Sequence, residues 1–235
     1  MELAEIEVRQ VERCGSTNAV LLAEGKPGIL LAAEEQTAGR GRRGKRWYCA
    51  PGAGVTFSLS VRIAKPVAGL SLVAGVGAAR ALRALGVRAA LKWPNDLVVD
   101  GAKLGGILVE TRGKLAVIGI GINCRRDAAL EAKLRRPLAS LDQFITVDRD
   151  HLIQSVGASL LAALATFESQ GLEPLRIEWE RMHAHTGERL RVRLANGRLV
   201  TGLARGLDRD GGLQLETRGG LRAVQSGRVL SARPA

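Results

Sequence analysis

The sequence predicts an α+β fold, in which helices pack on a central mixed or antiparallel sheet and a small β-barrel follows. Strand-like runs succeed one another over 90–100, 103–112 and 114–123 with tight turns between them, which favours antiparallel pairing. The segment 67–85 is rich in Ala, Leu, Val and Gly and predicts a long, mostly buried helix. From about residue 186 the pattern changes to period-two alternation with frequent turns, which predicts four or five short strands.

The other elements follow from local patterns. Residues 16–25 predict a helix that Ser16 or Thr17 can cap and that Gly25 ends. Strands are expected at 5–13, 28–36 and 55–63. Further helices are expected at about 127–144, 149–170 and 173–184. We therefore expect a first domain over 1–185 and a β-barrel domain over 186–235.

Composition favours an anionic partner. The chain has 235 residues, 46% of them hydrophobic, which is enough to bury a large core. Its 35 Lys and Arg residues outnumber 23 Asp and Glu residues, giving a net charge of +12. Such an excess favours nucleic acid, nucleotides or an acidic protein as partner. Much of the excess is arginine, so a genomic bias in composition is an equal alternative.

Cysteine, histidine and hydropathy exclude several classes of protein. The three cysteines are widely spaced without a CxxC motif, which indicates neither a disulfide framework nor a zinc site: Cys14, Cys49 and Cys124. The three histidines are interpreted as surface residues that form no metal site: His151, His183 and His185. The N-terminal stretch is acidic and unlike a signal peptide, and no uncharged apolar run approaches the ~18 residues of a membrane span. We expect a cytoplasmic protein without a membrane partner.

The segment AGRGRRGKRWYCAPG over 38–52 crowds five cations among glycines: Arg40, Arg42, Arg43, Lys45 and Arg46. It matches G-x-G-x-x-G and most of a P-loop, but both motifs require a helix directly after the glycines. Pro51 and further glycines follow instead, and Arg46 stands where a P-loop needs Ser or Thr. We therefore reject both dinucleotide and P-loop binding.

The loop is nevertheless suited to an anion. Glycines allow backbone N–H groups to approach a ligand, arginines match carboxylate and phosphate oxygens, and Trp47 offers a face for stacking. Because the five charges repel one another, we expect the loop to be mobile alone and to order when an anion binds. A solvated basic loop or a non-specific RNA contact explains the loop alone equally well.

Three further motifs carry polar groups into structured segments. GSTN (15–18) places hydroxyls and an amide at a helix start, and KWPND (92–96) sets Lys92 beside Asp96 in an apolar run. KLGGILVE (103–110) opens with Lys103, followed by two glycines. Unpaired charges are unfavourable inside a strand, so Lys92 and Asp96 are expected to be paired or functional. Each motif alone is also explained as a capped helix, a turn or a strand start.

Together with GIGIN (119–123), these motifs resemble the catalytic domain of a biotin protein ligase, a biotin–[acetyl-CoA-carboxylase] ligase. The β-barrel segment resembles the C-terminal domain of that family, so the resemblance covers nearly the whole chain. It implies a catalytic domain similar to that of class II aminoacyl-tRNA synthetases. It also implies a reaction in two steps: biotin and ATP give biotinyl-5′-AMP, and a lysine of a biotin carboxyl carrier protein then takes the biotinyl group. Magnesium is expected to enter with ATP.

The resemblance also implies site residues. Biotin-binding residues are expected to be Ser16, Thr17, Asn18, Gln36, Arg40, Gly41, Arg42, Lys103, Gly106 and Gly119. Adenylate-binding residues are expected to be Arg40, Arg42, Trp47, Lys92, Lys103 and Asn123. The expected catalytic residues are Lys103, Arg42, Lys92 and Asp96, and no metal is held by the protein alone. Lys103 is expected to act as a cation at the α-phosphate and not as a base. Asp96 is expected to orient a cation and to meet the acceptor lysine.

Two departures from the family pattern qualify the resemblance. Only 14 residues precede GSTN, too few for the winged helix-turn-helix domain of bifunctional members, so no DNA binding is expected. The +12 charge would then attract an acidic carrier. Thr37 stands where some relatives have Gln, with little expected consequence.

Members of the family often dimerise through the central sheet, so a homodimer is a possible assembly.

Two alternatives remain at this point. A ligase of the same fold that attaches lipoate or octanoate shares the acyl-adenylate logic, although GRGRRG, KWPND and the C-terminal barrel favour biotin. An RNA-binding protein would show steeply salt-dependent binding and no use of ATP. It leaves the motifs GSTN, KWPND and KLGGILVE unexplained.

Overall fold

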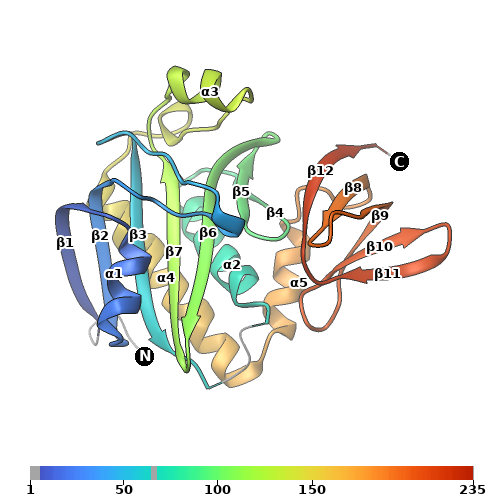
Figure 1. Cartoon of the computed structure of the whole chain (residues 1–235), viewed down its shortest axis with the longest axis horizontal. Helices are drawn as coiled ribbons and strands as arrows, with labels where there is room; N and C mark the ends of the chain where they lie inside the picture. The colour runs from blue at the N-terminus through green and yellow to red at the C-terminus, as the bar shows by residue number, and fades with distance from the viewer. Residues whose placement is uncertain (1–5, 65–67, 235) are drawn as a thin grey trace.

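The computed structural model of the protein describes residues 6–64 and 68–234, and its centre is a seven-stranded sheet (Figure 1). The strand order is β1-β2-β3-β7-β6-β5-β4. The strands are β1 (Glu7–Cys14), β2 (Ile29–Gln36), β3 (Gly54–Arg62), β4 (Ala90–Lys92), β5 (Asp96–Val99), β6 (Ala102–Arg112) and β7 (Leu115–Asn123). Strands β1 and β2 pair in parallel and the other neighbours pair antiparallel, which confirms the expected mixed sheet.

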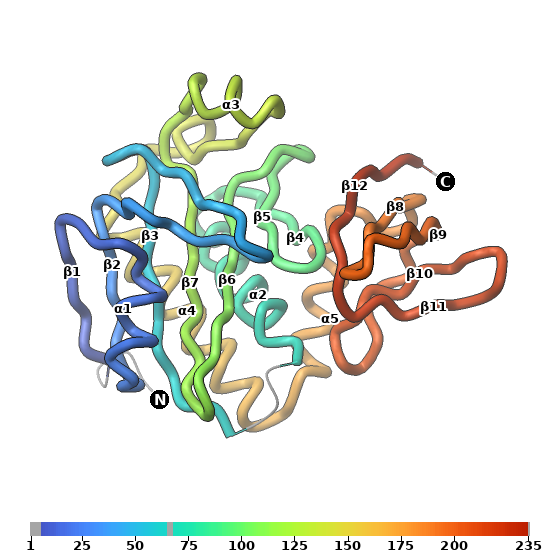
Figure 2. The backbone as a smooth tube through the Cα atoms, viewed as in Figure 1, coloured from blue at the N-terminus to red at the C-terminus, as the bar shows by residue number. Residues whose placement is uncertain are grey.

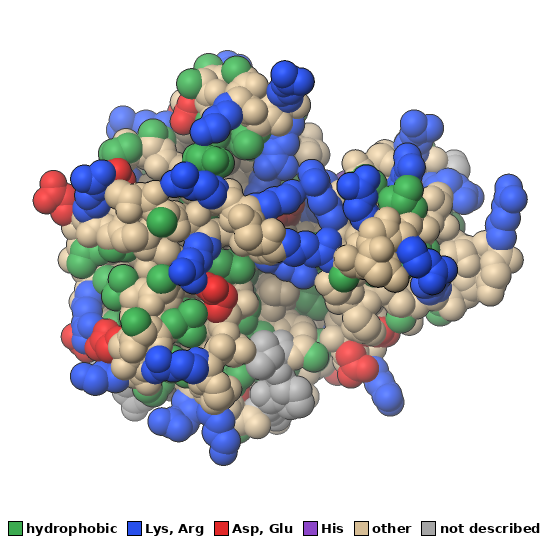
Figure 3. All heavy atoms as spheres, viewed as in Figure 1, with side chains coloured by type: hydrophobic (Ala, Val, Ile, Leu, Met, Phe, Trp, Pro, Cys, Tyr) green, Lys and Arg blue, Asp and Glu red, His purple; other side chains and the backbone are tan. Residues whose placement is uncertain are grey.

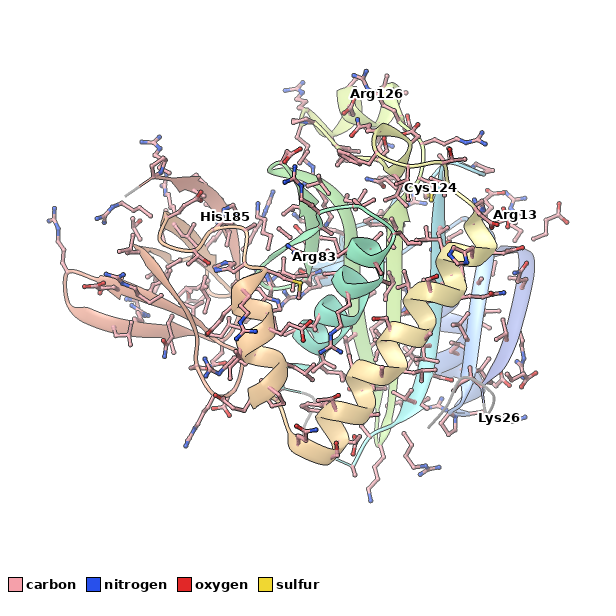
Figure 4. All side chains as sticks on the ribbon, turned by 180° about the vertical axis from the view of Figure 1, so that it is seen from behind. Arg13, Lys26, Arg83, Cys124, Arg126 and His185 are labelled. Atoms are coloured by element: carbon pink, nitrogen blue, oxygen red, sulfur yellow. The ribbon has the colours of Figure 1, made fainter. Side chains whose placement is uncertain are left out.

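Helices cover both faces of this sheet. The helices of the described chain are α1 (Thr17–Glu24), α2 (Leu70–Ala84), α3 (Ala128–Leu134), α4 (Arg149–Gln170) and α5 (Glu173–Arg181), of which α1, α2 and α4 pack on the sheet. Seen from behind, α2 and α4 lie across one face, with α5 beyond them (Figure 4). Helix α1 packs on the opposite face, against β2, β3, β6 and β7. The expectation that no apolar run approaches the length of a membrane span is wrong for α4, which by length and composition could cross a membrane. Half of its apolar window is buried in the fold, as in the core helix of a folded domain.

The predicted helices agree with the structure except over 127–144. Helix α1 ends at Gly25, whose φ of 75° is in the left-handed region, as expected for a C-terminal cap. The long helix expected over 67–85 begins at Leu70, and residue 67 lies outside the described residues. The helix expected over 127–144 is wrong beyond Leu134. Arg135 adopts a left-handed conformation and Pro137 follows, so only a 3₁₀ turn, Leu141–Gln143, remains.

The two faces of the sheet differ in chemistry. The face under α2 and α4 is apolar, and the predicted side chains of β3 are all buried there: Val55, Phe57, Leu59, Val61 and, just after the strand, Ile63. The opposite face has only a small apolar cluster, formed by Leu21, Ile29, Leu31, Leu115 and Val117. Elsewhere this face carries the buried Ser58, while Thr56 and glycines of β6 and β7 line a cavity. Polar and small residues on a sheet face leave room for a ligand.

The strand expected over 90–100 is instead a hairpin. Strands β4 and β5 pair antiparallel, and the Trp93–Pro94 peptide bond between them is cis. Lys92 and Asp96 are direct cross-strand partners, which confirms that KWPND sets them side by side. Trp93 is buried and donates its Nε1–H to the Gly211 carbonyl, 3.2 Å away, in the C-terminal region.

The C-terminal region forms a second, antiparallel sheet in the order β11-β10-β9-β8-β12. Its strands are β8 (Arg189–Leu194), β9 (Leu199–Leu207), β10 (Leu213–Thr217), β11 (Gly220–Val224) and β12 (Gly227–Arg233). The five strands match the expected number. In the described part of the chain β11 and β12 do not pair, so the small barrel is open. Its core is continuous with the main core, and the boundary at 185 stays a prediction.

His183 is not the surface residue that the sequence suggested. It is 9% exposed and stacks on Trp179, with ring centroids 4.6 Å apart. Neither ring nitrogen finds a partner among the described residues, and burial lowers the pKa of His183 to about 3. His185, labelled in Figure 4, is half-buried and lies 2.8 Å from a carboxylate oxygen of Glu188. The folded chain therefore holds His183 neutral.

Stability is expected to fall when the solution is acidified. The unfolded chain takes up a proton at His183 near pH 6.5, whereas the folded chain does not until about pH 3, so acid favours unfolding. Between pH 7 and pH 5 this group should cost about 2 kcal/mol of unfolding free energy. Denaturant titration of wild type and His183→Phe at pH 7 and pH 5 measures this loss of unfolding free energy. Equal pH dependence in the two proteins would contradict the assignment.

Candidate active site

The predicted site residues gather around one cavity of about 520 Å³. It lies on the α1 face of the main sheet, where the loop between β2 and β3 crosses β7 and β6 (Figure 2). Helix α3 and the C-terminal sheet also contribute to the lining. All but one of the predicted site residues line the cavity: Ser16, Thr17, Asn18, Gln36, Arg40, Gly41, Arg42, Trp47, Asp96, Lys103, Gly106, Gly119 and Asn123. The exception is Lys92.

One end of the cavity is a chain of buried hydrogen bonds. The backbone N–H of Thr17 donates to Oε1 of Gln36 over 2.8 Å, so the Gln36 amide nitrogen stays available to a ligand. Thr17 Oγ1 lies 2.6 Å from Ser58 Oγ, which donates to Asn18 Oδ1 over 2.6 Å. Asn18 Nδ2 donates to Glu110 Oε2 over 2.9 Å. This chain fixes hydroxyl and amide groups at the start of α1, although the expected Ser16 side-chain cap is not formed.

Two glycines of β7 make the packing on the cavity floor possible. A Cβ atom on Gly119 would lie 2.3 Å from Asn18 Oδ1. A Cβ atom on Gly121 would lie 2.4 Å from the indole ring of Trp47. Any larger residue would displace these side chains, because such contacts are far inside van der Waals distance. The glycines of GIGIN therefore allow the side chains of Asn18 and Trp47 to pack directly against the sheet backbone.

The basic loop forms a small hairpin over the sheet. The N–H of Gly41 donates to the Lys45 carbonyl over 2.7 Å, and that of Trp47 donates to the Gly39 carbonyl over 3.0 Å. A single 3₁₀ turn, Arg42–Gly44 (η2), sits at its tip, and extended chain follows. The rejection of a P-loop is therefore confirmed, since no α-helix opens after the glycines. Mobility of the loop without ligand stays a prediction.

Side chains of the loop reach across the cavity. Arg42 donates to Asn95 Oδ1 over 3.3 Å, and burial, with the neighbouring Arg43 charge, lowers the pKa of Arg42. Arg40 lies 3.5 Å from Glu110, at the end of the polar chain. The Trp47 Nε1–H is buried and finds no acceptor among the described residues. An acceptor atom of a ligand would satisfy it.

Lys103 and Asp96 form the ion pair of the site. Lys103 donates to Asp96 from β6, and its ammonium lies 5.7 Å from the centre of the Trp47 ring. Lys92 stands behind this pair on β4, outside the lining of the cavity. Burial lowers the pKa of Lys92, and the Asp96 charge opposes that shift. The expected contact of Lys92 with a phosphate therefore stays a prediction.

The other end of the cavity is strongly cationic. Arginines from separate segments join the loop here, and the sequence interpretation did not include them: Arg136, Arg193 and Arg228. Burial lowers the pKa of Lys45, and the charges of Arg228 and Arg136 add to that shift. Among the described residues that line the cavity, Asp96 is the one acid. Lys and Arg side chains accordingly gather where the loop faces the C-terminal sheet (Figure 3).

Asn123 and α3 form the remaining wall. Asn123 donates its amide to the carbonyls of Lys103 and Ala139, over 3.2 and 3.0 Å, and so holds two segments of the wall together. Leucines from 130–138 line the cavity beside Tyr48. Lys133 of α3 packs over the Tyr48 ring at 4.0 Å. The cavity therefore combines apolar, polar and cationic surfaces, which an amphipathic organic anion requires.

Comparison with known proteins agrees with this chemistry. Residues 11–127 match the biotin/lipoate A/B protein ligase family, and residues 185–230 match the biotin protein ligase C-terminal domain. The biotin–[acetyl-CoA-carboxylase] ligase of Paracoccus denitrificans is 32% identical over 234 residues, covering 92% of this chain and 97% of the relative. This chain belongs to the biotin protein ligase family.

Other biotin protein ligases support the same placement. The Mycobacterium tuberculosis biotin–[acetyl-CoA-carboxylase] ligase is 33% identical over 237 residues, covering 95% of this chain and 88% of the relative. The bifunctional ligase/repressor BirA of Escherichia coli is 37% identical over 227 residues, covering 91% and 70%. The Aquifex aeolicus biotin protein ligase in complex with biotin and ATP superposes with a TM-score of 0.86 at 26% identity, covering 97% and 99%. The expected family, fold and enzyme class are thus confirmed: the protein is a ligase.

Proposed function

We propose that this biotin protein ligase forms biotinyl-5′-AMP from biotin and ATP and transfers the biotinyl group to a lysine of a biotin carboxyl carrier protein. One observation carries the proposal. A single cavity joins the hydrogen-bonded polar end at α1 to a cationic end with one acid, and Lys103 lies in the same lining. Biotin offers a ureido ring for the first end, and its carboxylate and the ATP phosphates are anions for the second. The Aquifex aeolicus complex supports both substrates.

In the first step a biotin carboxylate oxygen attacks the α-phosphorus of ATP. A P–O bond forms, the bond to the β-phosphate breaks, and pyrophosphate leaves. Lys103 and Arg42 supply fixed positive charge where negative charge develops at phosphorus, which lowers the barrier. Magnesium enters as part of the substrate MgATP, held mainly by phosphate oxygens and water. Trp47, with its unpaired indole N–H, is available to the adenine.

In the second step the amine of the acceptor lysine attacks the acyl carbon of the adenylate. The C–N bond forms, the C–O bond to AMP breaks, and the nitrogen loses a proton. Asp96 is the one carboxylate in the described lining and is proposed to meet that lysine. The names of the Mycobacterium tuberculosis and Paracoccus denitrificans relatives support acetyl-CoA carboxylase as the source of the carrier.

The proposal includes no repressor role and no membrane partner, and it places the protein in the cytoplasm. The three cysteines are free thiols, which suits a reducing compartment: Cys14, Cys49 and Cys124. A homodimer through the central sheet stays a prediction.

The test is to incubate the purified protein with MgATP and either biotin or lipoate. Pyrophosphate release and mass spectrometry of a trapped adenylate report the first step. We expect biotinyl-AMP from biotin only. Adenylate from lipoate instead would retain the mechanism and change the substrate, whereas no adenylate from either would contradict the proposal and make RNA binding the next measurement.

Gly119→Ala is expected to weaken biotin binding selectively. The added methyl group must displace the Asn18 side chain from its place beside Ser58, which disturbs the polar end of the cavity. The KM for biotin in pyrophosphate release should rise at least about tenfold, and the KM for ATP should change little. Gly15→Ala is the matched control, since a Cβ atom there meets nothing within 4 Å. Unchanged biotin KM in Gly119→Ala would show that the Asn18 position is irrelevant to biotin.

A further inference from the structure

The outer face of the C-terminal sheet carries arginines that stand opposite one another. On strands β8 and β12, Arg193 is the cross-strand partner of Arg228, and Arg189 is the partner of Arg233. Arg191 lies between them, opposite Ser231. We call this set the arginine face: Arg189, Arg191, Arg193, Arg228 and Arg233, all exposed. Like charges directly opposite each other destabilise a sheet, so the arrangement requires an explanation.

Among the residues that the structure describes, no ion pair supplies a counter-charge to this face. None of its five arginines forms an ion pair within the described ranges 6–64 and 68–234. Residues 186–235 contain ten arginines and four acids, and the acids have other partners. Glu216 pairs with Arg205, Asp210 with Arg209 and Glu188 with His185, while Asp208 accepts from Gln225. An anionic ligand or partner would therefore neutralise the charges of the arginine face.

The size of the face indicates a macromolecule. Arg193 and Arg228 line the cavity, whereas Arg189, Arg191 and Arg233 lie further along the same two strands, outside its lining. Four residues of strand span about 13 Å, so the face runs about that far from the cavity to Arg189. The proposed function already assigns ATP to the cationic residues inside the cavity, so ATP does not account for the three arginines outside the lining. Charges outside the lining can act on a partner that covers the mouth of the cavity.

We propose that the arginine face docks an acidic surface of the acceptor protein, an inference that rests on the proposed transfer to a carrier lysine. A partner bound to β8 and β12 adjoins the cavity at Arg193 and Arg228, which line it and are also exposed, so they stand at its rim. Arginine presents planar forked donors that match carboxylates in pairs. The position at the cavity mouth favours a protein over a nucleic acid, because only the acceptor has to deliver a group into the site.

The experiment compares two double variants of equal charge change. Arg189→Glu with Arg191→Glu alters the face without touching the cavity lining. The control is Arg218→Glu with Arg222→Glu, two exposed arginines in and beside β11, which lies at the opposite edge of the sheet from β12. Pyrophosphate release from biotin and MgATP measures the first step, and transfer to an apo biotin carboxyl carrier domain measures the second. Each is measured at about 50 mM and about 500 mM NaCl.

We expect unchanged pyrophosphate release in both variants. The face variant should show a KM for the carrier domain raised about tenfold at low salt, with kcat unchanged, and high salt should shrink the difference. The control should stay within about twofold of wild type. An equal KM for the carrier domain in wild type and both variants would overturn the docking site. A face variant that keeps the wild-type KM for the carrier domain and loses only binding to a single-stranded RNA would overturn it as well. If wild type itself forms no adenylate, it is the proposed function that fails.

Discussion

Lys103→Ala is expected to reduce adenylate formation to a small residual rate while leaving the fold intact. The ammonium is one of the two cations assigned to the α-phosphate and is held by Asp96 in the cavity lining. Removing a fixed charge from a developing phosphoryl centre should slow pyrophosphate release by about 10²- to 10³-fold. The backbone pairing of Lys103 with Val98 in β5 does not depend on its side chain. Steady-state pyrophosphate release and a thermal melt of the same variant measure the two effects.

Two controls distinguish charge from packing at this position. Lys103→Arg keeps the cation and should recover part of the rate, because the proposed role is electrostatic and involves no proton transfer. Lys92 remains opposite Asp96 in Lys103→Ala, so the carboxylate keeps a cationic neighbour and the melting temperature should change little. Near-normal pyrophosphate release by Lys103→Ala would refute the role, and a collapsed melt would assign Lys103 to stability instead.

Most strands of this fold can be predicted because their burial is periodic. Alternating apolar residues predict β3 and the antiparallel succession β5, β6 and β7, which the structure confirms. The parallel pairing of β1 with β2 has no local signal, because it depends on the direction in which α1 returns the chain. The hairpin at Pro94 interrupts a run that periodicity alone joins into one strand. The burial of His183 likewise depends on a long-range contact, because its backbone pairs with Leu91 of β4.

Some residues of the candidate site can likewise be predicted from the sequence, and others cannot. Residues in motifs of unusual composition, such as Lys103 between an apolar strand and two glycines, stand out from their surroundings and can be selected from the sequence. Arg136, Arg193 and Arg228 do not stand out, because they lie in segments already rich in arginine. Glu110 is similar: its place between Asn18 and Arg40 exists only once β6 has folded beside α1. A functional residue can be selected from the sequence when its type contrasts with its neighbours, but the contacts that folding creates between distant segments cannot be predicted in this way.

Arg42→Gly is expected to form adenylate, more slowly than wild type, because Lys103 still supplies a cation at the α-phosphate, but to hold the adenylate poorly. Arg42 reaches from the loop over the cavity to Asn95, and we propose that its guanidinium holds the phosphate of the bound intermediate. Without it the mixed anhydride should escape before the carrier arrives and acylate unrelated lysines. The measurement is biotin incorporation into a bystander protein such as serum albumin, with biotin, MgATP and no carrier. Wild type should label the bystander weakly and the variant at least about tenfold more.

The matched control for this prediction is Arg43→Gly. It removes one cation from the same loop, and the Arg43 φ of 57° is a conformation that glycine adopts without strain, so the backbone is retained. Its side chain contacts Ser226 of the C-terminal sheet, 3.2 Å away, and not Asn95. If the loop retains adenylate through total charge, both variants should leak equally. If retention belongs to the side chain of Arg42, only Arg42→Gly should label the bystander more than wild type does. Bystander labelling by Arg42→Gly at the wild-type level would remove Arg42 from this role.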